Sequence, residues 1–209
     1  MTETIAVAIT GASGAQYALR LLQCLVEADL SVALMLSPPA QVVIGMETDI
    51  SLPGRSAEIQ RFLIDHYRAR AGQIRVYGHQ EWTAPLASGS GVPRAMVVCP
   101  CSMGSLAAIA CGASDNLIER AADVVLKEHR KLILVPRETP YSTIHLENML
   151  KLARMGTVIL DANPGFYQRP ASLDELVDFV VARILDHLEV PHRLAVRWGS
   201  TDRNIDRDP

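Results

Sequence analysis

A short turn rich in small residues, Thr10-Gly11-Ala12-Ser13-Gly14, follows the first apolar run of the chain. Glycines let the backbone turn tightly, and the first residues of a helix present free N–H groups to an anion. We therefore predict a phosphate site at this turn. The same pattern also fits an ordinary strand-to-helix turn, because a short glycine motif is weak evidence when it stands alone.

The residues around this turn favour a mononucleotide over NAD. The dinucleotide fingerprint has a third glycine a few residues further on and a carboxylate at the end of the second strand, which binds a ribose hydroxyl. The three residues after Gly14 contain no glycine, and the second apolar run ends in Leu36-Ser37-Pro38. No tyrosine is followed by a lysine four residues later, the pair that a short-chain dehydrogenase needs. Ser37 suits a phosphate or the edge of a flavin.

A second loop of small residues, Cys99-Pro100-Cys101-Ser102-Met103-Gly104-Ser105, follows another apolar run and leads into a helical pattern. We expect Ser102 to cap that helix, and Ser102 and Ser105 to face a phosphate or a ring. The Cys-X-Cys pair invites comparison with metal sites. A structural zinc site needs four ligands in paired spacing, however, so buried reduced thiols are the preferred interpretation and no metal is expected.

Basic residues suggest a second phosphate site. Arg120 and Lys127 are seven residues apart in one helical pattern, which places them on the same face about 10 Å apart. Arg137-Glu138 follows a predicted strand, and an arginine fork suits a phosphate. A solvated helix face would show the same spacing of Arg120 and Lys127. No Asp-Asp-X-X-Asp motif is present, so a monophosphate bound without metal is favoured over a magnesium-bound diphosphate.

These residues must be positioned by alternating strands and helices. Strands are predicted at 5–10, 31–36, 74–77, 95–99, 132–136 and 157–160, and helices at 15–28, 37–48, 57–69, 106–110, 116–129, 144–154 and 173–188. Continuous apolar strands separated by helices indicate a parallel sheet covered on both faces. The predicted fold class is therefore α/β, a doubly wound sheet, in which ligands bind beyond the carboxyl ends of the strands.

Composition indicates a globular protein that does not bind nucleic acid through charge. Hydrophobic residues make up 49 % of the 209 residues. The formal net charge is -3, so no basic excess draws the chain to nucleic acid or to an acidic membrane surface. We expect one domain over 1–209 with a flexible polar tail from about 199. No signal peptide or apolar run long enough to span a membrane is present, and the four cysteines do not form a secreted disulfide framework. We therefore expect a cytoplasmic protein.

The sequence resembles the UbiX family of flavin prenyltransferases over nearly its whole length, roughly residues 4–199. The matching segments are Thr10–Gly14, Glu47–Asp49, Ala87–Ser90, Val98–Ser102, Asp115–Asp123, Leu134–Glu138, Ile144–Leu150, Pro164–Tyr167 and Asp178–Arg183. The resemblance implies a flavodoxin-like sheet and a homododecamer with sites between subunits. One departure is Asp161, where relatives usually have proline; this puts the stiffness of the following loop in question.

The resemblance also implies roles for individual residues. The residues that it assigns to FMN are Gly11, Ala12, Ser13, Ser37, Ser102, Met103, Gly104, Ser105 and Arg137. Those that it assigns to dimethylallyl phosphate are Tyr167 and Arg183, with Arg120, Lys127, Arg137 and Glu138 near the phosphate. Ser13 and Glu47 lie near the reacting flavin edge, Lys127 aids departure of the phosphate, and Glu47 and Glu138 are candidate proton carriers. Trp198 either stabilises an allyl cation or is a hydrophobic plug.

The implied activity is transfer of a dimethylallyl group to N5 and C6 of reduced FMN. The product, prenylated FMN, would pass to a UbiD-type decarboxylase in ubiquinone biosynthesis or aromatic acid decarboxylation. Two other functions remain open. One is a flavin-dependent decarboxylase acting on a polyprenyl-hydroxybenzoate or a peptidyl-cysteine, and the other is a non-catalytic FMN-storing or delivery protein. The arginine and lysine set favours a phosphate substrate.

Overall fold

Six apolar runs form one parallel sheet in the computed structural model of the chain, which describes residues 4–195. The strands are β1 (Thr4–Ile9), β2 (Ser31–Leu36), β3 (Ile74–Tyr77), β4 (Ala95–Cys101), β5 (Lys131–Pro136) and β6 (Val158–Ile159). Their order is β3-β2-β1-β4-β5-β6, and every neighbouring pair is parallel. This is the strand order of the doubly wound nucleotide-binding folds, so the predicted fold class is confirmed.

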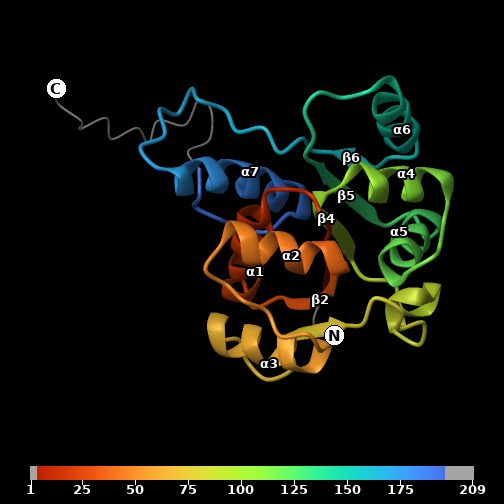
Figure 1. Cartoon of the computed structure of the whole chain (residues 1–209), viewed down its shortest axis with the longest axis horizontal. Helices are drawn as coiled ribbons and strands as arrows, with labels where there is room; N and C mark the ends of the chain where they lie inside the picture. The colour runs from red at the N-terminus through yellow and green to blue at the C-terminus, as the bar shows by residue number, and fades with distance from the viewer. Residues whose placement is uncertain (1–3, 196–209) are drawn as a thin grey trace.

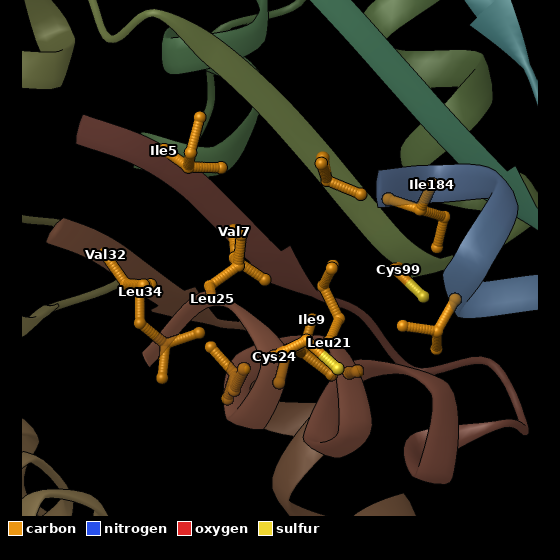
Figure 2. Packing of buried hydrophobic residues seen from close by; sticks show 14 of the residues in the cluster. Ile5, Val7, Ile9, Leu21, Cys24, Leu25, Val32, Leu34, Cys99 and Ile184 are labelled. Atoms are coloured by element: carbon orange, nitrogen blue, oxygen red, sulfur yellow. The ribbon is translucent and has the colours of Figure 1, made fainter. Parts of the chain in front are cut away.

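Helices cover both faces of the sheet (Figure 1). Those whose buried residues pack on one face are α1 (Ala15–Glu27), α2 (Pro38–Glu47), α3 (Ser56–Tyr67) and α7 (Leu173–Leu188). Those on the other face are α4 (Met103–Cys111), α5 (Leu117–Lys127) and α6 (Thr143–Arg154). Because side chains alternate along a strand, β1 serves both layers: Ile5, Val7 and Ile9 join the first core, as Figure 2 shows, and Ala6 and Ala8 join the second.

Five helices begin at a side chain that accepts a backbone N–H from three residues further on. These capping residues are Ser37, Ser102, Asn116, Ser142 and Ser172. Such caps satisfy N–H groups that have no partner inside the helix. The cap at Ser102 explains why α4 begins at Met103, three residues before the predicted start. The predicted strand at 157–160 is shorter in the structure, where only Val158 and Ile159 form β6.

The loose segment between β3 and β4 contains two short 3-10 turns, η1 (Pro85–Ala87) and η2 (Gly89–Gly91), which the sequence did not predict. Gly91 lies too close to Pro85 for a side chain, since a Cβ there would be 2.4 Å from the Pro85 oxygen. The segment packs on α5 through η1. Within residues 4–195, no helix is both long enough and apolar enough to cross a membrane.

The two loops of small residues follow β1 and β4, which are neighbours in the sheet. The connections on either side of this pair run in opposite directions, and doubly wound sheets bind their ligands in a crevice at such a point, beyond the carboxyl ends of the strands. We call this place the crevice. The end of β5 lies beside it, because Cys101 is paired in register with Pro136. The fold therefore brings the turn at 10–14, the loop at 99–105 and the segment starting at Arg137 to one edge of the sheet.

Candidate active site at the carboxyl edge of the sheet

Thr10 joins the two loops of small residues. Its hydroxyl donates to the Pro100 carbonyl at 2.8 Å and accepts from the Ser102 N–H at 2.8 Å, and its own N–H donates to the same carbonyl at 3.3 Å. The side chain is buried, with 1 % exposed. Thr10 was not among the predicted site residues. The signal in the sequence was a threonine directly after an apolar run.

Glu47, at the end of α2, lies at the start of α1. One carboxylate oxygen accepts the N–H groups of both Gly14 and Ala15 at 2.9 Å. The turn allows this because Gly14 has a φ of 111°, a conformation that glycine adopts without strain. These two N–H groups are therefore already bonded within the chain, and the predicted phosphate site at the turn stays a prediction that depends on other donors. The anion at the helix start is the chain's own carboxylate, which the helix dipole favours as it would a phosphate.

The pKa of Glu47 lies below its ordinary value. Partial burial raises it, but hydrogen bonds from Ser13, Gly14 and Ala15 and the positive charge of Arg137 outweigh that effect and favour the charged form. The structure thus brings together three of the predicted residues, Ser13, Glu47 and Arg137. They come from the ends of β1, α2 and β5, which are far apart in the sequence.

Replacing Glu47 by glutamine should destabilise the ligand-free protein by about 1–2 kcal/mol at neutral pH, because the charge at the helix start is lost. A carboxylate with a lowered folded-state pKa stabilises the protein above its unfolded pKa, and this stability is lost as pH falls through the folded value. The deficit of Glu47→Gln should therefore shrink in acid. Urea unfolding at pH 7 and at pH 4 measures it, with Glu147→Gln on the exposed side of α6 as control. An equal deficit at both pH values would contradict the assignment.

Ser37 and Gly11 shape the other side of the crevice. The Ser37 hydroxyl accepts the Ala40 N–H at 3.2 Å, and the Ser37 N–H donates to the Ile9 carbonyl at 3.0 Å. A Cβ on Gly11 would lie 2.4 Å from the Cβ of Pro39, which is too close for any side chain. Gly11 is therefore needed for packing against α2, in addition to its freedom to turn. The contact with Pro39 was not predicted from the sequence.

The loop at 102–105 presents two hydroxyls that are bonded to each other. Ser102 Oγ lies 3.1 Å from Ser105 Oγ and accepts the Ser105 N–H at 3.3 Å. The predicted cap is confirmed, and both serines remain partly exposed. Met103 points the other way, into the second core, with 9 % exposed. A Cβ added to Gly104 would meet nothing within 4 Å, so the space above this residue is open to a ligand.

Replacing Gly104 by alanine should leave the ligand-free fold unchanged or slightly more stable, because the added methyl group meets no protein atom. If a flavin packs on this turn, FMN affinity should fall by about tenfold, as expected for a contact forced out of place. Thermal unfolding and calorimetric FMN titration test this. The matched control is Gly54→Ala, where a Cβ also meets nothing within 4 Å. Equal FMN affinity in both variants would show that Gly104 does not contact FMN.

Arg120, Lys127 and Arg137 do not form one cluster within the chain. Helix α5 precedes β5 and runs back along the sheet, so Lys127, four residues before β5, lies at the amino edge, whereas Arg137 follows β5 at the carboxyl edge. A phosphate site shared by the three would therefore need more than one copy of the chain, and the predicted site stays a prediction. Arg120 instead donates to the Ala87 carbonyl at 3.0 Å and pairs with Asp123 at 2.8 Å.

The other residues predicted to bind the prenyl phosphate lie on different elements of the fold. Lys127 pairs with Glu128 beside Gly89, where a Cβ would clash with the Glu128 carboxylate. Arg183 lies on the exposed side of α7 and pairs with Asp186 at 2.6 Å. Tyr167 packs edge-on against Phe179 at a centroid distance of 5.7 Å. The predictions about Trp198 and the tail from residue 199 fall outside the described residues.

The two cysteines of the second loop are buried, as predicted. Burial raises the pKa of the Cys101 thiol to about 12, and burial followed by the neighbouring Cys101 raises that of Cys99 above its usual range. Both thiols therefore stay protonated and are poor nucleophiles at neutral pH. Among residues 4–195, no group of three or more histidine, cysteine, aspartate or glutamate side chains is arranged to bind a metal ion.

Comparison with known proteins decides the family. The family model described as Flavoprotein matches residues 1–185. The flavin prenyltransferase UbiX of Pseudomonas aeruginosa is 59 % identical over 197 residues, which cover 94 % of this chain and 94 % of that protein. The chain belongs to the UbiX family of flavin prenyltransferases. The resemblance inferred from the motifs is confirmed.

Two solved UbiX-like structures match at the level of the fold. AnUbiX (PadA1), determined in complex with FMN and dimethylallyl pyrophosphate, is 39 % identical, covers 96 % of this chain and 99 % of its own, and has a TM-score of 0.85. A dodecameric FMN-dependent UbiX-like decarboxylase from Escherichia coli O157:H7 is 42 % identical, covers 94 % of this chain and 100 % of its own, and has a TM-score of 0.83. The UbiX fold thus accounts for the whole described sheet.

Proposed function

We propose that the chain is a flavin prenyltransferase that transfers a dimethylallyl group from dimethylallyl phosphate to N5 and C6 of reduced FMN. The observation that carries the proposal is its similarity along the whole chain to AnUbiX, which is solved with FMN and dimethylallyl pyrophosphate. The crevice supports it independently. Open space above Gly104, the hydroxyls of Ser37 and Ser102 and the Arg137 guanidinium fit a flavin mononucleotide.

When bound, reduced FMN supplies the nucleophilic atoms that take up the prenyl group. The residues of the chain do the rest. Cationic side chains stabilise the phosphate as negative charge grows on its oxygen during cleavage of the allylic C–O bond. Ser13 and Glu47 orient the edge of the flavin, since their mutual hydrogen bond fixes both at the turn. Glu138, the residue after Arg137, accepts the Thr139 N–H at 3.1 Å and would be the candidate to carry the protons that ring closure requires.

A complete phosphate site would be built from neighbouring copies of the chain. Lys127 and Arg137 lie at opposite edges of the sheet, and Arg183 lies on α7, so one copy does not surround a single phosphate. Large apolar side chains exposed on α2, on α6, between β6 and α7 and at the start of α7 suit contacts between copies; they are Val42, Met46, Ile144, Leu146, Leu150, Phe166 and Leu173. The E. coli relative is dodecameric, and the proposal extends that assembly to this chain.

Light scattering at micromolar concentration should give a mass near that of twelve chains. Buried subunit contacts account for the exposed apolar side chains and would be lost if the protein were a monomer. Replacing Met46, whose side chain is 81 % exposed, by glutamate should shift the protein to smaller species without unfolding it. A monomeric parent protein would contradict the proposed assembly and the shared site.

Mass spectrometry of the released flavin tests the activity directly. The protein is incubated anaerobically with reduced FMN and either dimethylallyl phosphate or dimethylallyl diphosphate. A covalent increase in flavin mass supports prenyl transfer, and comparison of the two substrates shows which phosphate form is used. Recovery of unchanged FMN from both incubations would contradict prenyl transfer and would favour a role in FMN storage or delivery. Release of CO2 from a polyprenyl-hydroxybenzoate without flavin modification would support the decarboxylase.

The remaining assignments complete the proposal. The product would pass to a UbiD-type decarboxylase, the protein would act in the cytoplasm, and residues 1–209 would form a single domain. Negligible binding of NAD is part of the same proposal, because Ser37 stands where a dinucleotide site has its carboxylate. Titration with NAD and with FMN compares the two ligands.

A further inference from the structure

A hydrogen bond between two side chains joins the segments that follow β5 and β6. The Tyr141 hydroxyl donates to Asp161 Oδ1 at 2.6 Å. Tyr141 lies four residues after Arg137, and Asp161 begins the segment that carries Tyr167; we call residues 160–170 the Tyr167 loop. The strands β5 and β6 are parallel neighbours, so both segments leave the sheet at its carboxyl edge.

The bond is short, and its donor remains protonated. The pKa of Tyr141 lies above its ordinary value, because of burial, the hydrogen bond to Asp161 and the negative charges of Asp161 and Glu138, which the charge of Arg137 opposes only in part. The ring is partly buried against the second core and meets His145 edge-on. Tyr141 is therefore a fixed donor within electrostatic range of two candidate active-site residues.

Two backbone hydrogen bonds join the start of the Tyr167 loop to the sheet. The N–H of Leu160 donates to the Leu134 carbonyl at 2.9 Å, and that of Ala162 donates to the Pro136 carbonyl at 3.1 Å. Asp161 lies between these two anchors. Its negative charge also helps to raise the pKa of Tyr17 on α1, after the larger effects of burial and Cys99. The Asp161 side chain thus links the base of the loop to the residues around the crevice.

We propose that Asp161 is a positioning residue that holds the Tyr167 loop in place through Tyr141. This inference rests on the proposed prenyl transfer, since Tyr167 is the loop's candidate phosphate ligand. The pair fixes the loop relative to the segment bearing Arg137 and Glu138. It acts mainly on the placement of the prenyl phosphate, because the candidate FMN residues other than Arg137 lie on the loops that follow β1, β2 and β4.

The test compares Tyr141→Phe, Asp161→Ala, Asp161→Asn and the double variant Tyr141→Phe/Asp161→Ala. The first two remove the bond; asparagine keeps an acceptor for the Tyr141 hydroxyl. The control is Tyr67→Phe, which removes a hydroxyl that donates to the Leu19 carbonyl at 3.0 Å, away from this edge of the sheet. Amide hydrogen exchange of peptides spanning 160–169 reports the loop directly, whether or not the protein is an enzyme.

Exchange in the loop should accelerate by about three- to tenfold in Tyr141→Phe and Asp161→Ala, as expected for loss of one hydrogen bond. The double variant should match the single ones, and Asp161→Asn and Tyr67→Phe should match the parent. The KM for dimethylallyl phosphate should rise by a similar factor, with kcat and FMN affinity much less affected. Unchanged exchange, or faster exchange with an unchanged KM, would overturn the proposal. Faster exchange in a protein that makes no prenylated flavin would instead refute the proposed function and leave the loop contact standing.

Discussion

Replacing Lys127 by alanine should reduce kcat/KM for prenylation by at least ten- to a hundredfold, with FMN affinity unchanged. A charge-assisted hydrogen bond contributes about 1.5–3 kcal/mol, which corresponds to this factor in binding. The transition state should lose more than the ground state, because the departing phosphate gains charge as the bond breaks. Arg183→Ala should behave in the same way, since Arg183 is assigned to the same phosphate.

The substitution Lys127→Ala should change activity without changing the stability of the fold. Lys127 pairs only with the exposed neighbouring Glu128 among the ion pairs of the described residues, and such surface pairs contribute about 0–1 kcal/mol to stability. The fold should therefore survive the change. The control is Lys151→Ala on the exposed side of α6. A Lys127→Ala protein that prenylates at the parent rate would show that this helix face is merely solvated.

Arg137→Ala should weaken both FMN binding and prenylation, each by about tenfold or more, by the same estimate for a charged hydrogen bond. Arg137 differs from Lys127 because it lies at the crevice, where its charge lowers the pKa of Glu47. Removing it should therefore also raise the pKa of Glu47 towards its ordinary value. The measurements are a calorimetric FMN titration and a prenylation rate, with Arg154→Ala in the last turn of α6 as control.

The outcomes of Arg137→Ala separate two arrangements. If FMN affinity falls, Arg137 contacts the flavin or its phosphate in the crevice. If only prenylation falls, Arg137 belongs to the prenyl phosphate alone and the assignment to FMN is wrong. If neither changes, the crevice beyond β5 is not the active site.

The sequence predicted the fold because the relevant signals are local. Apolar runs such as that of β4, and capping residues such as Ser102, decide strand and helix within a few residues, and the crossover rules then limit the topology. The sites beyond the strand ends followed from the same reasoning. The position of Met103 in the core did not, because a loop between two serines gives no sign of which side chain turns inward.

Contacts between segments that are far apart in the chain could not be predicted from the sequence. Glu47 reaches the N–H of Gly14 across 33 positions, and Thr10 reaches Pro100 across 90. No local pattern indicates which carboxylate will approach a given helix start. The separation of Lys127 from Arg137 within one chain could not be predicted for a related reason. Spacing along one helix indicates the face of α5 but not which edge of the sheet its last turn reaches.

The carboxylate of Glu47 at the start of α1 bears on the stability of the protein between the release of one flavin and the binding of the next. In the proposed reaction the flavin is consumed and leaves as product, so the protein must repeatedly exist empty. A fold that relied on the cofactor to neutralise its helix dipole would loosen at every cycle. Here the chain carries its own counter-charge, with two backbone N–H groups already satisfied. The start of α1 therefore does not depend on a bound ligand for its negative charge, and the protein can release its modified flavin without this helix losing that charge.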